Sequence, residues 1–160
     1  MKTNAARILD ALGIRYELRE YDPGDEHITA EEVARRVSLP PEQVYKTLCV
    51  RGDRHGVALA IVAATSDLDL KALAKLTGDR KVEPVALKEV TPLTGYVRGG
   101  VTALGGKKDY PVWVDETMIL HERVAVSAGV RGTQIVLAPD DYLRATKGTT
   151  GDIARDRSST

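Results

Sequence analysis

Apolar residues recur at helical spacing in the first half of this chain and again near its end. The clearest case is 69–76, where Asp69 can cap a run of leucines three residues apart and Gly78 can end it. The segment Thr29-Ala30-Glu31-Glu32 has the form of a capping box, which starts a helix. Helices are therefore predicted at 3–13, 29–37, 69–78, 85–90 and 139–146.

Short runs of aliphatic and β-branched residues predict strands at 16–21, 44–50, 57–64, 95–98, 112–115, 124–127 and 135–138. Helices cluster early and unevenly spaced strands follow, which argues against repeated βαβ units. The pattern predicts an α+β fold, a single domain with a mixed, largely antiparallel, barrel-like sheet flanked by helices. Residues 147–160 are rich in Gly, Thr, Ser, Arg and Asp, so most of this segment is expected to be a loose tail.

Composition restricts the possible functions. The 160 residues include 23 basic and 23 acidic side chains, and the formal net charge is zero. A neutral chain has no overall field to gather nucleic acid, which argues against a DNA-binding protein. No apolar run is long enough to predict a membrane span, and 1–13 lacks the form of a signal peptide. One cysteine excludes an internal disulfide framework and fits a cytoplasmic location.

A lysine interrupts the apolar face of the predicted strand at 44–50. Side chains alternate along a strand, so Lys46 shares its face with Val44, Leu48 and Val50. Burying an unpaired ammonium group is costly, so such a lysine needs an anionic partner, a ligand or a lowered pKa. The pattern alone leaves two interpretations, an edge lysine that reaches solvent or a lysine that lines a ligand cavity.

Two further stretches place glycines where a backbone can approach a ligand. The first, 95–108, contains five glycines and ends in a lysine pair, but it lacks the Gly-Lys-Ser/Thr ending of a phosphate loop. The second, 124–132, is a strand that runs into Ser127-Ala128-Gly129. Taken alone, each is more often an ordinary turn, with a bulged strand end in the first and a serine that satisfies turn backbone in the second, and Ser127 lies outside any Gly-x-Ser-x-Gly motif. The three histidines lack metal-ligand spacing, so no metal site is predicted.

Taken together, these stretches resemble the YbaK/EbsC family. Its members are free-standing aminoacyl-tRNA deacylases that remove cysteine from mischarged proline tRNA, and they are similar to the editing domain of bacterial prolyl-tRNA synthetases. The resemblance runs from about Thr3 to Ile153. It rests on Tyr45-Lys46-Thr47-Leu48, Thr94-Gly95-Tyr96 with Gly99-Gly100, Leu104-Gly105 with Lys107-Lys108, and Val126-Ser127-Ala128-Gly129 with Arg131-Gly132.

The resemblance implies a compact deacylase domain over 1–153 with one cleft, and it leaves 154–160 as a disordered tail. It implies catalytic positions at Lys46, Gly99 and Ser127, and substrate-binding positions at Tyr21, Thr47, Gly100 and Gly129, with no metal and no cofactor. The chain departs from the family pattern after Ser127, where Ala128 and Val130 replace a glycine and a lysine, and Gln134 stands where the family has an aspartate.

The implied reaction is hydrolysis of the ester in Cys-tRNA(Pro), with the thiol of the bound cysteine attacking its own ester carbonyl. The implied partners are the 3′ acceptor end of an aminoacyl-tRNA and prolyl-tRNA synthetase, with no membrane and no DNA. Two alternatives remain at this point. The chain could deacylate another mischarged tRNA, of the Ala-tRNA(Pro) type, or it could bind an aminoacyl-tRNA or nucleotide without catalysis.

Overall fold

The computed structural model describes residues 2–157. Its helices are α1 (Asn4–Ala11), α2 (Ala30–Arg36), α3 (Leu70–Thr77), α4 (Leu87–Thr94) and α5 (Pro139–Thr146), with 3-10 turns at Pro41–Gln43 and Glu116–Leu120. Its strands are β1 (Glu17–Glu20), β2 (Tyr45–Gly52), β3 (Gly56–Ala63), β4 (Ser66–Leu68), β5 (Val82–Pro84), β6 (Val112–Asp115), β7 (Val124–Ser127), β8 (Thr133–Leu137), β9 (Thr149–Gly151) and β10 (Ala154–Asp156). Among the described residues no helix is long and apolar enough to cross a membrane.

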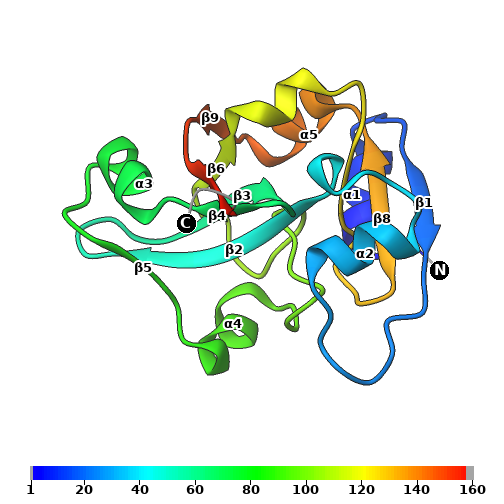
Figure 1. Ribbon diagram of the computed structural model, residues 1–160, viewed down its shortest axis with the longest axis horizontal. Coiled ribbons are helices and arrows are strands. Elements are labelled where there is room, and N and C mark those ends of the chain that lie inside the picture. The colour runs from blue at the N-terminus through cyan, green and yellow to red at the C-terminus, as the bar shows by residue number, and fades with distance from the viewer. Residues whose placement is uncertain (1, 158–160) are drawn as a thin grey trace.

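The strands form three sheets, and Figure 1 shows how most of these strands are arranged in space. The largest has the order β5-β2-β3-β6-β9, with β2 antiparallel to β3 and β5, and β6 parallel to β3 and β9. The antiparallel sheet β1-β8-β7 lies beside it, and a bridge between Val44 and Ala125 joins the two. The third sheet pairs β10 with β4. The mixed α+β fold class is confirmed, although the sheets do not close into a complete barrel.

Strand β3 is buried on both faces, which explains its continuous apolar sequence. One face of the β2-β3 hairpin packs into a cluster with Tyr45, Cys49 and Ile61, which α1, β7, β8 and α5 complete. The other face packs against α3, where Leu73 is fully buried. Figure 1 shows α3 and α4 on opposite sides of β2 and β5. The alternation predicted for 44–50 is therefore confirmed.

Local helix signals are confirmed by the capping contacts. The hydroxyl of Thr3 accepts from the Ala6 N–H at 3.2 Å, and that of Thr29 accepts from the Glu32 N–H at 3.1 Å. The carboxylate of Asp69 begins α3 in the same way, at 3.0 Å from the nitrogen of the third residue along. These contacts satisfy backbone donors that a helix leaves unpaired at its start.

Two predictions about local structure are wrong. The strand expected at 95–98 is a turn, because Gly95 ends α4 with φ 81° and the chain reverses there. The loose tail expected after Lys147 is instead two strands, β9 and β10, with the fully buried Ile153 between them. The disordered tail expected at 154–160 is corrected for 154–156, which pair with β4, whereas 158–160 lie outside the described residues.

Candidate active site

A cavity of about 590 Å³ opens beside strand β2. Residues 44–50 form one wall, and the segment leading into α2, the start of α4, the loop at 98–101 and the ends of β7 and β8 form the others. This volume lies within the range of ligand sites in proteins, roughly 300–1,000 Å³. The four sequence-predicted residues Lys46, Thr47, Gly99 and Ser127 all line this cavity, although they come from three separate parts of the chain.

Lys46 is half-buried in the cavity wall. Burial lowers the pKa of its ammonium group, and the positive charge of Arg157 lowers that pKa further. The carboxylates of Asp67 and Glu31 act in the opposite direction, but Arg157 is ion-paired with both, at 3.0 Å from Asp67. Within residues 2–157 Lys46 forms no ion pair, so its charge is available to an anionic ligand.

The two glycine turns pack directly against each other beside the cavity. Gly99 has φ +87°, and a Cβ there would lie 3.3 Å from the Arg131 side chain. A Cβ on Gly100 would lie 3.1 Å from the backbone of Val130, and one on Gly129 would lie 2.9 Å from a ring carbon of Tyr96. Glycine is therefore required by close contact between the turns at 96–100 and 127–132.

Backbone donors differ between the two glycines of the first turn. The N–H of Gly100 donates to the Val97 carbonyl at 2.9 Å, so it is already engaged. The N–H of Gly99 has no hydrogen-bond partner in the described part of the chain, and Gly99 lines the cavity. Of this pair, Gly99 is the residue that can offer a backbone donor to a ligand.

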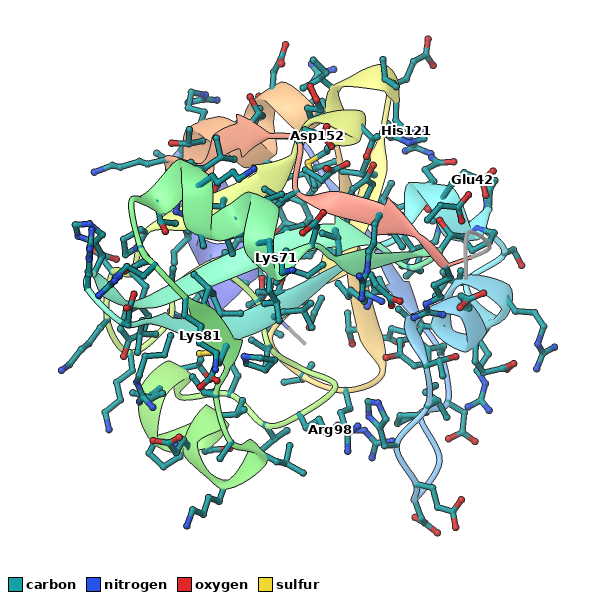
Figure 2. All side chains as sticks on the ribbon, turned by 60° about the vertical axis from the view of Figure 1, so that its left-hand side comes forward. Glu42, Lys71, Lys81, Arg98, His121 and Asp152 are labelled. Carbon is teal, nitrogen blue, oxygen red and sulfur yellow. The ribbon has the colours of Figure 1, made fainter. Side chains whose placement is uncertain are left out.

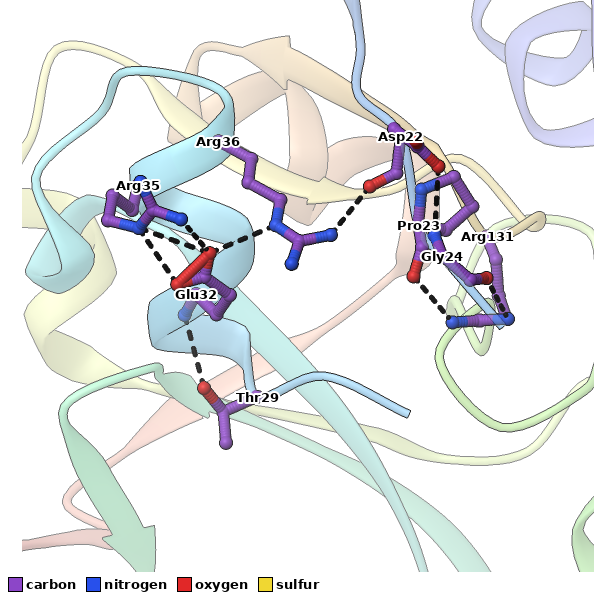
Figure 3. A network of polar contacts seen from close by, with 8 residues as sticks. All are labelled: Asp22, Pro23, Gly24, Thr29, Glu32, Arg35, Arg36 and Arg131. Atoms are coloured by element: carbon purple, nitrogen blue, oxygen red, sulfur yellow. Dashed lines mark hydrogen bonds and ion pairs between the residues drawn. The ribbon is translucent and has the colours of Figure 1, made fainter. Parts of the chain in front are cut away.

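Arg131 fixes the loop that leads into α2, as Figure 3 shows. Its guanidinium donates to the carbonyl oxygens of Pro23 at 2.9 Å, Gly24 at 3.3 Å and Glu26 at 2.6 Å. Arg36 holds the same loop from the other side by donating to the Asp22 carbonyl at 2.7 Å. The loop then supplies part of the cavity wall at His27 and Ile28. Arg131 thus supports the site from behind.

Ser127 ends β7, and its hydroxyl oxygen accepts a hydrogen bond from the Gly129 N–H at 3.2 Å. The serine therefore satisfies turn backbone, as the simpler interpretation expected, and it also lines the cavity. Among the described residues its hydroxyl contacts no histidine and no carboxylate. A serine nucleophile needs an adjacent base, so this geometry favours a hydrogen-bonding role for the Ser127 hydroxyl.

The remaining predicted residues, Tyr21, Gly100 and Gly129, are absent from the cavity lining. Tyr21 donates its backbone N–H to the Gly132 carbonyl at 2.9 Å, which ties β1 to the second turn. Gly100 and Gly129 form the packed turns, and they are absent from the lining residues. Within residues 2–157 no three His, Cys, Asp or Glu side chains gather as a metal site.

Three lining residues, His27, Arg98 and Gln134, were not predicted from the sequence as site residues. His27 has its pKa lowered by burial and then by the charges of Arg98 and Arg131. In Figure 2, Arg98 lies below the strands of the large sheet, far from Asp152 above them. Gln134 pairs with Ser127 in the β7-β8 register, and it is 5% exposed. The sequence feature that could have indicated Gln134 is a polar residue directly before three aliphatic residues in β8.

Comparison with known proteins identifies the family. Residues 26–145 match the model of the aminoacyl-tRNA editing domain. An Enterococcus faecalis protein, EbsC, with the provisional name Cys-tRNA(Pro)/Cys-tRNA(Cys) deacylase, is 38% identical over 95% of this chain and 93% of its own. The protein YwhH of Bacillus subtilis is 27% identical over 71% of each chain. This chain belongs to the aminoacyl-tRNA editing domain family, which confirms the resemblance seen in the sequence.

Solved structures show the same fold. A protein provisionally described as a trans-editing enzyme for prolyl-tRNA synthetase superposes with a TM-score of 0.82, at 26% identity over 97% of this chain and 99% of its own. A hypothetical protein, APE2540, superposes with a TM-score of 0.86 at 22% identity, over 96% of this chain and all of its own. The architecture is therefore shared along nearly the whole length of the chain.

Proposed function

We propose that this protein is a free-standing aminoacyl-tRNA deacylase that hydrolyses mischarged Cys-tRNA(Pro). The observation that carries this proposal is the meeting of Lys46, Gly99 and Ser127 in one cavity. They supply a cation, a free backbone donor and a hydroxyl, which suit the phosphate, the ester carbonyl and the ribose of a tRNA end. Family membership and the name of the E. faecalis relative support the same reaction.

In this proposal Lys46 holds the terminal phosphate, because a lysine ammonium is a compact, strong cation for phosphate. The Gly99 N–H points to the ester carbonyl, where one well-placed donor to the developing oxyanion contributes about 3–4 kcal/mol. Ser127 donates its hydroxyl hydrogen to the substrate while its oxygen stays bonded to Gly129. Each group binds or stabilises, and none of the three attacks.

The attacking group is then the thiol of the bound cysteine. Its sulfur forms a bond to the ester carbonyl carbon, the bond from that carbon to the ribose oxygen breaks, and the thiol proton ends on the ribose. The cysteine leaves as a cyclic thioester, which water hydrolyses. Holding thiol and carbonyl in attack geometry supplies up to roughly 7–11 kcal/mol of the barrier. A site that positions without a nucleophile is what this mechanism requires.

The test is the decay of cysteinyl, alanyl and seryl esters of the same proline tRNA with catalytic amounts of protein. We expect multiple turnovers on the cysteinyl ester and a rate at least about 100-fold lower on its S-methyl derivative, which cannot form the cyclic product. Faster hydrolysis of the alanyl ester would assign the Ala-tRNA(Pro) activity instead. Tight binding of all three esters without turnover would make the protein a binding module.

Recognition of the tRNA body would come through prolyl-tRNA synthetase. With a net charge of zero, the protein neutralises few phosphates, so its own affinity for tRNA should be weak and should vary little with salt. Adding the synthetase should lower the KM for Cys-tRNA(Pro). Strong discrimination between isolated tRNAs by this protein alone would contradict this part of the proposal.

A further inference from the structure

Gln134 occupies the middle strand of the three-stranded sheet, between Arg19 of β1 and Ser127 of β7. Its side chain is 5% exposed and lines the cavity. The side-chain oxygen Oε1 is buried and has no hydrogen-bond partner within residues 2–157. A buried amide oxygen without a donor costs free energy, and such atoms are uncommon in folded proteins. As the side chain stands the oxygen is closed off from the cavity, so a ligand donor can reach it once the amide turns about its terminal bond.

The strand order gives Gln134 a defined position relative to the other lining residues. Val44 and Ala125 form a parallel bridge, and two residues further along each strand are Lys46 and Ser127. Ser127 in turn pairs with Gln134 in the β7-β8 register. Paired strands lie about 4.8 Å apart, which sets the spacing of Ser127 and Gln134, and Lys46 continues the row on β2 beyond the isolated bridge. A cation lies at one end of this row and an acceptor at the other.

We infer that Oε1 of Gln134 accepts a hydrogen bond from the α-ammonium group of the substrate's amino acid. This inference rests on the proposed function. An aminoacyl end carries its phosphate and its ammonium group at opposite ends, which matches a lysine at one end of the row and an acceptor at the other. The ammonium group is the strongest donor of the aminoacyl group, because charge-assisted hydrogen bonds exceed neutral ones. It also avoids Lys46, whose like charge repels it. Gln134 is thus a residue that recognises the amino acid.

The test uses two adenosine analogues in which an amide replaces the reactive 3′ ester. One carries cysteine, and the other carries 3-mercaptopropionate, which lacks the amino group. The wild-type protein should bind the cysteine analogue about 10- to 100-fold more tightly, as measured by calorimetry. The Gln134→Leu variant should bind both within about twofold of each other, and Gln134→Glu, which keeps an acceptor, should retain the preference.

A purely structural role for Gln134 predicts that Gln134→Leu lowers the melting temperature. The inference predicts a melting temperature equal to or above that of the wild type, because the substitution removes an unsatisfied acceptor at similar volume. The matched control is Gln43→Leu, because Gln43 donates to the Arg123 carbonyl outside the cavity and should leave the preference unchanged. A Gln134→Leu variant that keeps the full preference overturns the inference. Hydrolysis of Cys-tRNA(Pro) by a wild-type protein that lacks the preference contradicts this inference alone, whereas the preference without hydrolysis contradicts the proposed function alone.

Discussion

Replacing Lys46 by methionine should reduce deacylation strongly while leaving the fold intact. Methionine keeps the apolar stem that packs in the β2 wall and removes the charge. An ammonium and a phosphate about 4 Å apart attract by about 4 kcal/mol at the effective dielectric constant of a protein surface. The desolvation of the ammonium group opposes this attraction, and the charges of Arg157, Asp67 and Glu31 also act on the ammonium group. Together they reduce the net attraction to about half. A loss of about 2–3 kcal/mol corresponds to roughly 30- to 150-fold in kcat/KM.

The assay is steady-state hydrolysis of cysteinyl-tRNA at fixed salt, with thermal unfolding of each variant measured in parallel. Lys81→Met is the matched control. Lys81 lies directly before β5, its side chain is exposed and pairs with Glu83, and it is absent from the cavity lining. Figure 2 shows Lys81 apart from Arg98, which lines the cavity. A Lys46→Met variant that retains more than about a third of the wild-type kcat/KM would refute a role for this charge.

The pH dependence of kcat/KM is a second, independent test of the Lys46 ammonium group. Burial and then the Arg157 charge lower the pKa of Lys46, whereas the hydrogen bond that Lys81 donates to the Glu83 carboxylate raises the pKa of Lys81. As pH rises, Lys46 therefore loses its proton before an exposed lysine does. The wild-type kcat/KM should fall as pH passes through this lowered pKa, and the profile of Lys46→Met should lack that fall.

Four further variants test the surrounding structure. Gly129→Ala should destabilise the protein by about 1–3 kcal/mol in chemical denaturation, because φ at Gly129 is +95° and the new Cβ would contact Tyr96. Gly24→Ala is the control and should cost less, because a Cβ on Gly24 would meet no atom within 4 Å. Asp115→Ala should cost about 3–5 kcal/mol, since this 1%-exposed carboxylate accepts from two backbone N–H groups of the C-terminal segment, and a cost below about 1 kcal/mol would contradict that account. Ser127→Ala should lower kcat about tenfold without abolishing it, and detection of an acyl-enzyme by intact mass in the wild type would instead indicate a covalent route.

The sequence predicted those features that depend on nearby residues. Helix starts at Thr3, Thr29 and Asp69 were predictable because each cap bonds a backbone nitrogen three residues away. Strands β9 and β10 were missed because their composition is that of a tail, and their order depends on distant partners. Asp115 supplies one of these, accepting from the Ile153 nitrogen at 3.0 Å across 38 positions of sequence.

In the candidate site, too, the features that depend on nearby residues were predictable and those that depend on long-range contacts were not. Lys46 was suggested by a single-strand pattern, since a charge on an apolar face is visible locally. The contact between the two glycine turns is long-range and entered the sequence reasoning through family resemblance. Gln134 was missed as a ligand residue because its meaning depends on burial and on an unsatisfied oxygen, and neither can be read from residue order.

The ion pairs of Arg157 have a consequence for the cavity, although Arg157 is absent from its lining. Arg157 follows β10 and pairs with Glu31 of α2 and Asp67 of β4. Both carboxylates act on the charge of Lys46, so by engaging them Arg157 leaves that ammonium group without an ion pair among the residues that the structure describes. The charge that meets a ligand in the cavity is therefore set in part by a side chain outside it.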